Sequence, residues 1–184
     1  MSRKQDGYIR KEASEITQIS ARTIQYYTDR GFVIPDVAAP TGRGTTRRYS
    51  RKNLVELSFI KELSAHGYTL EKIDRIMGVV RTDLDKFWDK SNDMPCATDL
   101  LLLLKDPRTK DVEVHLLRIG EIHLDELITR RGLRNFSVIG LERVILRILR
   151  VAIGSSKLEA YLELLRRQEV LGYSEEEVAR ILDE

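Results

Sequence analysis

The stretch SARTIQYYTDRGFVIP, residues 20–35, predicts a short helix with a defined start and a defined end. Ser20 can cap this helix, because its hydroxyl accepts from a backbone N–H that has no partner within the helix. Gly31 suits the left-handed conformation that ends many helices. One side of the helix, which can pack on a core, carries Ala21, Ile24 and Tyr27. The other side carries Arg22, Gln25, Tyr26 and Asp29. We therefore expect one face to be exposed and chemically specific.

The segment before this helix predicts another short helix. In YIRKEASEIT, residues 8–17, apolar Ile9, Ala13 and Ile16 recur at the spacing of an amphipathic helix. Residues 17–19 then make a tight connection. Two short helices joined in this way form a helix-turn-helix, whose second helix can enter the major groove of DNA. Short helical hairpins also occur in all-α proteins that never touch DNA, so the hairpin alone leaves both interpretations open.

A basic segment without any acid follows the hairpin. In TGRGTTRRYSRK, residues 41–52, Gly42 and Gly44 indicate a turn whose flanks could pair as a two-stranded wing. The basic residues of the segment are Arg43, Arg47, Arg48, Arg51 and Lys52, with Tyr49 among them. Such a cluster suits contact with nucleic-acid phosphates, although most basic loops are simply solvated. Its position directly after the hairpin favours phosphate contact.

Two amphipathic helices, capped by Ser50 and Thr69, complete the order helix, helix, wing, helix, helix. Residues 8–77 in this order resemble the N-terminal domain of MerR-family transcriptional regulators. The family's recognition-helix pattern stands here as Ser20-Ala21-Arg22-Thr23-Ile24-Gln25-Tyr26-Tyr27, followed by Gly31-Phe32. The end of the family's wing stands as Arg47-Arg48-Tyr49, and the link between its next two helices as Gly67-Tyr68-Thr69-Leu70. Gln25 stands where the family usually has arginine.

The resemblance implies a mainly α protein in two parts. Residues 1–77 would form a winged helix-turn-helix DNA-binding domain with a small two-stranded wing. Residues 78–184 would form a helical dimerisation and effector region. The implied partners are double-stranded DNA with a palindromic promoter site, a second copy of the chain in a homodimer, and RNA polymerase at the promoter.

The expected DNA-binding residues lie on the hairpin and the wing. They are Ser20, Arg22, Thr23, Gln25, Tyr26, Arg43, Arg47, Arg48 and Tyr49. Arg22 is best placed to reach a guanine edge, and Gln25 prefers adenine. Tyr26 and the wing arginines suit phosphate contacts, which position a protein on the duplex.

The charge distribution agrees with a DNA-binding head on a different body. Residues 1–53 carry eleven Lys and Arg and five acids, a net charge of +6. The whole chain carries +2, so the remainder carries −4. A basic N-terminal part and an acidic C-terminal part are what we expect of a DNA-binding domain joined to a region that does not bind DNA.

The C-terminal region predicts more helix. Residues 137–153 form an apolar stretch with a polar stripe of Arg143, Arg147 and Arg150, and such a helix needs cover from its own domain or from a second subunit. An amphipathic helix is expected over 156–170. Residues 111–131 alternate like a strand at first and then space like a helix, and we favour a helix. An apolar run of five leucines, residues 100–104, precedes them.

No effector site stands out in this region. Cys96 is the single cysteine, so neither an intrachain disulfide nor the paired thiolates of a soft-metal sensor can form within one chain. His115, Glu121, His123 and Asp125 are potential metal ligands, but scattered residues of this kind are usually solvated. Trp88, Tyr161 and Tyr173 could line a lipophilic pocket, although aromatic residues are more often core. We expect no metal and no cofactor, and the effector remains unknown.

The sequence predicts a cytoplasmic protein that is not an enzyme. The N-terminus has no apolar segment typical of a signal peptide, and the most apolar run contains four charges, too many for a membrane-spanning helix. No catalytic motif is recognisable. Two other functions remain open: an excisionase-like recombination factor with a similar winged head, and a protein-interaction adaptor with a degenerate head that docks a partner on residues 137–153.

Overall fold

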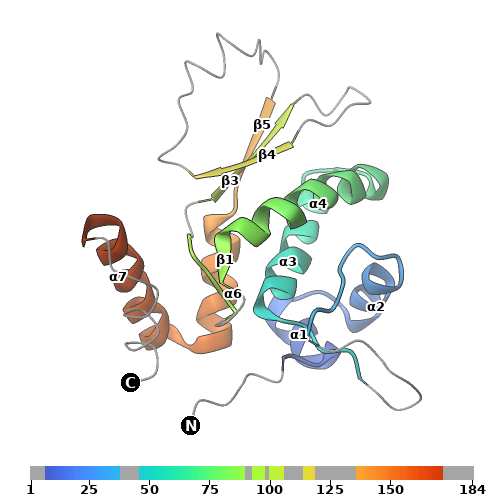
Figure 1. The fold of residues 1–184 in the computed structure, drawn as a ribbon. Coiled ribbons are helices and arrows are strands. Elements are labelled where there is room, and N and C mark those ends of the chain that lie inside the picture. The colour runs from blue at the N-terminus through green and yellow to red at the C-terminus, as the bar shows by residue number, and fades with distance from the viewer. Residues whose placement is uncertain are drawn as a thin grey trace.

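The computed structural model describes residues 7–37, 46–89, 93–97, 100–105, 114–118 and 136–171 (Figure 1). The helices are α1 (Arg10–Thr17), α2 (Ala21–Asp29), α3 (Arg51–Ala65), α4 (Leu70–Leu84), the short 3-10 helix η1 (Asp85–Phe87), α6 (Glu142–Ile153) and α7 (Ser155–Leu171). The strands are β1 (Trp88–Asp89), β2 (Met94–Pro95), β3 (Leu100–Lys105), β4 (Val114–Arg118) and β5 (Phe136–Gly140). The fold is mainly α, as the sequence predicts.

The helix caps of the N-terminal half form as expected. Ser20 Oγ accepts from the Thr23 backbone N–H at 3.1 Å, and Ser50 Oγ accepts from Asn53 at 3.1 Å. Gly31 ends the α2 segment with φ of +76°, a conformation that glycine adopts without a Cβ penalty. The helix-turn-helix of α1 and α2 packs on α3, so these local signals determine the first half of the fold.

Only the end of the expected wing can be evaluated. Residues 38–45 lie outside the described part of the chain. Tyr49 forms an antiparallel bridge with Tyr8, in which each backbone N–H donates to the other residue's carbonyl, at 2.8 and 2.9 Å. The last residues of the basic segment are therefore anchored beside the entry to α1.

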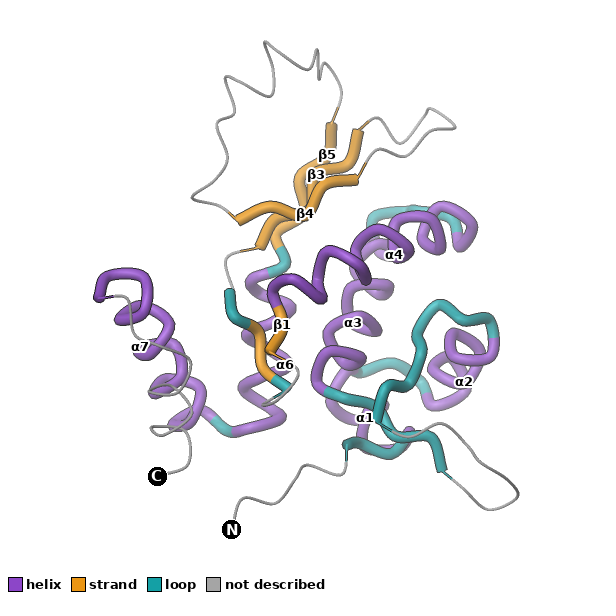
Figure 2. The backbone as a smooth tube through the Cα atoms, viewed as in Figure 1, coloured by secondary structure: helices purple, strands orange, loops and turns teal. Residues whose placement is uncertain are grey.

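The prediction of a helical C-terminal region is wrong for residues 100–105, 114–118 and 136–140. These residues form a three-stranded antiparallel sheet in the order β4-β3-β5 (Figure 2). The leucine run is the central strand of this sheet, and a short continuous apolar run is consistent with a strand as well as with a helix. Within the expected helix over 111–131, Val114 and Leu116 belong to a strand, whereas residues 111–113 and 119–131 lie outside the described part of the chain. The helix expected from residue 137 begins only at Glu142, because β5 pairs with β3 along its whole length.

Helix α6 receives its cover from its own chain. Its buried residues are Val144, Ile145, Ile148 and Leu149. It packs on α1 and α3 on one side and on α7 on the other, and it lies between α3 and α7 in Figure 1. The apolar residues of the head and of the body belong to one continuous core. The apolar surface expected for residues 137–153 is therefore largely covered within one subunit.

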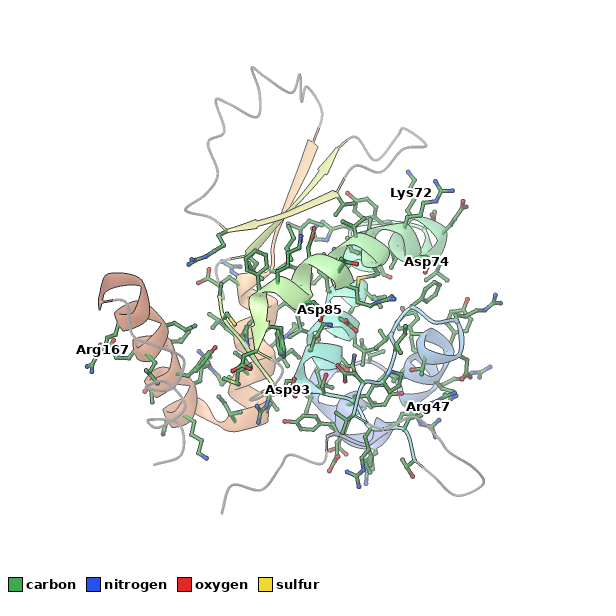
Figure 3. All side chains as sticks on the ribbon, viewed as in Figure 1. Arg47, Lys72, Asp74, Asp85, Asp93 and Arg167 are labelled. Atoms are coloured by element: carbon green, nitrogen blue, oxygen red, sulfur yellow. The ribbon has the colours of Figure 1, made fainter. Side chains whose placement is uncertain are left out.

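A carboxylate from the β1–β2 hairpin holds the start of α3. Asp93 Oδ2 accepts from the Arg51 backbone N–H at 2.6 Å, and Asp93 Oδ1 accepts from the indole N–H of Trp88 at 3.0 Å. Ser50 and Asp93 thus both satisfy donors at the same helix end, where a negative charge is also favoured. This contact joins the hairpin to the N-terminal half at the end of the basic segment; Asp93 is labelled in Figure 3.

We expect Asp93→Ala to lower the free energy of unfolding by about 1–2 kcal/mol, the usual cost of losing a helix cap. Urea denaturation followed by the fluorescence of Trp88 measures this loss. The matched control is Asp74→Ala, which removes an exposed aspartate from the second turn of α4 and should change stability by less than about 0.5 kcal/mol. Equal stability of the two variants would contradict the capping role.

A buried glutamate on α3 should make the fold sensitive to pH. Glu56 is 1% exposed, and burial raises the pKa of its carboxyl from 4.5 to about 7 despite the opposing charge of Lys52. Asn53 Nδ2 donates to this carboxyl at 3.1 Å, and Lys52 Nζ lies 3.8 Å from it. Because the folded protein holds the proton more tightly than the unfolded chain does, the stabilising effect is complete below about pH 4.5 and is lost as the pH rises through about 7.

Ionisation of Glu56 should cost the fold up to about 3 kcal/mol at about pH 9. Glu56→Gln keeps the shape without the charge, so it should match the wild type near pH 5 and become progressively more stable than the wild type toward pH 9. Denaturant melts of both proteins across this range measure the difference. Parallel stability curves would show that Glu56 does not titrate in this window.

Candidate nucleic-acid interface

Helix α2 presents two faces that differ sharply in burial. Ile24 is fully buried and Tyr27 is 9% exposed, so this face packs on the core. Arg22 is exposed, and Tyr26 is 40% exposed on the opposite side. The division into a packing face and a free face follows the sequence prediction. The guanidinium of Arg22 stands in the first turn, where a helix that enters a groove by its N-terminal end first meets base edges.

The adjacent residues Tyr26 and Tyr27 have different structural roles. The rings of Tyr26, Tyr27 and Phe32 form a cluster with centroid separations of 5.9–6.3 Å. The Arg30 guanidinium lies 5.6 Å from the centroid of the Tyr26 ring, within the range of a cation–π contact. Tyr27 therefore anchors α2, whereas Tyr26 is held in place by its neighbours and still reaches the surface.

Ser20 and Thr23 stabilise the start of α2. Their hydroxyl oxygens lie 2.7 Å apart, and Ser20 also caps the helix as described above. The structure gives these two predicted DNA-binding residues a local structural role at the end of the helix that carries Arg22.

A chain of polar contacts connects α1, α2 and the basic segment. Arg10 donates to the Gln25 side-chain oxygen, and Gln25 Nε2 donates to both Asp29 oxygens at 2.7 Å. Arg47 Nη1 donates to Asp29 Oδ1, also at 2.7 Å. The hydrogen bonds from Gln25 and then from Arg47 lower the pKa of the Asp29 carboxyl, so it is ionised at neutral pH. We call Arg10, Gln25, Asp29 and Arg47 the polar bridge.

An open pocket of about 580 Å³ lies along this bridge. Its lining residues are Ile9, Arg10, Lys11, Ala21, Gln25, Thr46, Arg47 and Tyr49. The start of α1, the exposed side of α2 and the basic segment thus enclose one cationic hollow. Sequence reasoning missed Arg10 and Lys11 as members of the site. Their basic character was visible, but their proximity to Arg47 depends on the Tyr8–Tyr49 bridge.

The remaining predicted residues of the basic segment have different outcomes. Arg43 lies outside the described residues. Arg48 is half-buried, and its Nη1 donates to the Gly7 carbonyl at 3.3 Å. Tyr49 is fully buried, and its hydroxyl lies 3.0 Å from Thr28 Oγ1. The Tyr49 side chain thus joins the basic segment to α2 in the free chain, and its contact with DNA stays a prediction.

The C-terminal region has no metal-binding cluster within the described residues. No group of three or more His, Cys, Asp and Glu side chains is suitably placed there. The potential ligands Glu121, His123 and Asp125 lie outside the described part of the chain, and Cys96 is exposed.

Trp88 and Tyr161, two of the aromatic residues that could have lined a lipophilic pocket, are part of the packing. Trp88 is 5% exposed, and Tyr161 is buried with its hydroxyl donating to the Pro95 carbonyl. Tyr173 lies outside the described residues. Within those residues, no helix is both long enough and apolar enough to cross a membrane.

A capped helix-turn-helix with a free polar face, flanked by a basic segment, defines the class of helix-turn-helix regulatory proteins. Residues 8–78 match the family model described as MerR HTH family regulatory protein. The mercuric resistance operon regulatory protein of Bacillus cereus is 31% identical, and the matched region covers 55% of this chain and 86% of that protein. The chain belongs to the MerR family.

Other relatives match a shorter part of the chain. Uncharacterized HTH-type transcriptional regulators of Mycobacterium bovis and Mycobacterium tuberculosis are 31% identical over 67 residues. The matched region covers 36% of this chain, and this chain spans 30% of the length of those relatives. The polar bridge and the free face of α2 lie within the residues that the family model matches.

Proposed function

We propose that the protein binds double-stranded DNA sequence-specifically through the exposed face of α2 and regulates transcription. The observation that carries this proposal is the position of Arg22 and Tyr26 on the free face of a capped helix, beside the cationic pocket. The helix supplies groups that can reach base edges. The pocket supplies positive charge for the phosphates on either side of the groove.

The residues of this surface would make different kinds of contact with DNA. Arg22 reads guanine through its paired N–H donors, and Gln25 suits adenine. Tyr26 contacts a phosphate with its hydroxyl. Arg47 holds a flanking phosphate, and because a guanidinium carries five N–H donors, it can do so while one of them remains on Asp29.

The proposed functional unit is a homodimer on a palindromic promoter site. One chain presents one recognition helix, which spans a half-site, and a two-fold protein matches a two-fold operator. RNA polymerase is the further partner, reached through the promoter. Neither a metal nor a cofactor is needed for this activity.

The test begins with selection of duplexes from a random library by the wild-type protein. A gel shift and a footprint on the recovered sequence should then reveal two protected half-sites. Sedimentation of the complex should give two chains per duplex, and transcription from a promoter with this site should change when the protein is added. Failure to enrich any sequence over the starting library would overturn the proposal.

The two alternative functions predict different results in the same assays. An adaptor would bind no duplex. It also loses support, because Val144, Ile145, Ile148 and Leu149 of α6 are buried within the chain. An excisionase-like factor would bind DNA and leave transcription unchanged.

A further inference from the structure

We propose that Asp29 sets the DNA specificity of the protein by lowering its affinity for every duplex through its charge and by orienting Gln25 for the right one. This inference rests on the proposed function and concerns a residue that makes no favourable contact with DNA. Asp29 is an acid on the side of α2 that also carries Arg22 and Tyr26, and its side chain is 50% exposed. A carboxylate on a surface that meets phosphates repels every duplex alike.

The position of this acid is unfavourable for α2 itself. Asp29 is the last residue of the helix, where the helix dipole disfavours negative charge. The polar bridge offsets this unfavourable interaction, since both carboxylate oxygens of Asp29 accept from Gln25 and one also accepts from Arg47. The bridge therefore keeps a negative charge on the DNA-facing surface at neutral pH.

The same contacts give Asp29 a second effect on recognition. Gln25 donates to Asp29 with its nitrogen and accepts from Arg10 with its oxygen, which fixes the direction of its amide. A fixed amide can match one base edge and is penalised on the others. Asp29 thus weakens all binding through its charge and restores binding at the right site through Gln25.

The effect of the charge can be estimated. A unit charge about 7 Å from a phosphate changes binding about threefold in water, and two subunits together change it about tenfold. Asp29→Asn should therefore tighten binding to a scrambled duplex about tenfold at low salt. Binding to the selected duplex should gain less, because Gln25 is held less firmly. The ratio of the two affinities should fall at least threefold, and Asp29→Ala should lower it further.

The matched control is Glu163→Gln. Glu163 is 51% exposed and is paired with Arg167 at 3.0 Å, so the substitution removes a similarly exposed, arginine-paired charge. It lies on α7, where Arg167 stands on the opposite side of the molecule from Arg47 (Figure 3). This variant should bind both duplexes within twofold of the wild type.

Fluorescence anisotropy measures the affinity for the selected duplex and for a scrambled duplex of equal composition. The ratio of these two affinities tests the inference. A fall in the affinity ratio for Asp29→Asn, with Glu163→Gln unchanged, supports the inference. An unchanged ratio in Asp29→Asn, or weaker binding to both duplexes, overturns it. A wild-type protein that does not distinguish the two duplexes would instead contradict the proposed function.

Discussion

Ile145→Glu is expected to abolish the folded state of the whole chain, including the DNA-binding head. Ile145 is fully buried on α6, in the core that also contains Ala13 of α1 and Leu57 of α3. An ionised carboxylate at such a position costs several kcal/mol, which approaches the total stability of a typical domain. Because head and body share one core, we expect the loss to reach both. Circular dichroism and urea denaturation measure it.

Val151→Glu is the control for this prediction. Val151 lies on the same helix but is 59% exposed, so a charge there should change the free energy of unfolding by less than about 0.5 kcal/mol. A folded Ile145→Glu protein with native helix content would mean that the head does not need the body. Charged residues at Leu141 or Ile145 would test folding rather than dimerisation, because both positions are buried within one subunit.

Arg22→Ala should weaken binding to the selected site by about 1–3 kcal/mol per half-site and should relax specificity at one symmetric pair of positions. The reason is the exposed position of Arg22 in the first turn of α2, from which a bidentate contact to guanine is possible. Affinities for a set of duplexes, each with one substituted base pair, measure the effect. An equal loss on all of them would place Arg22 on the phosphate backbone.

Arg47→Ala should change DNA binding in a different way from Arg22→Ala. It should weaken binding to the selected and scrambled duplexes alike, because a phosphate contact carries no sequence information. The dependence of affinity on salt should also become shallower by about 0.9 for each phosphate that is no longer neutralised, and by about twice that in a dimer. A loss confined to the selected duplex would show that Arg47 acts on specificity.

The helices of the N-terminal half could be predicted because their signals are local. Ser20, Ser50 and Thr69 each cap the helix that follows them, and Gly31 and Gly67 adopt the left-handed conformation. Each of these features depends on a few consecutive residues. The free face of α2 follows from the same spacing, so Arg22 and Tyr26 could be identified from the sequence.

The C-terminal sheet could not be predicted, because its pairing is non-local. Residues 101–105 pair with 136–140, which are distant in the sequence, and no local spacing announces such a pairing. The polar bridge has the same origin, since Arg10, Gln25 and Arg47 come from three separate segments. The burial of Tyr49 has a related origin: a tyrosine among arginines resembles a phosphate-binding residue, whereas its backbone pairs with the distant Tyr8 and its side chain is fully buried.

We propose that the exposed face of α2 reads base edges. A double-mutant cycle between Arg22 and guanine N7 is the most direct test of this role. Each guanine of the selected duplex is replaced in turn by 7-deazaguanine, which removes one acceptor from the major groove. Wild-type protein and Arg22→Ala are titrated with every duplex. We predict a coupling energy of about 1 kcal/mol or more at one symmetric pair of guanines and additive effects elsewhere. Additive effects at every guanine would contradict the claim.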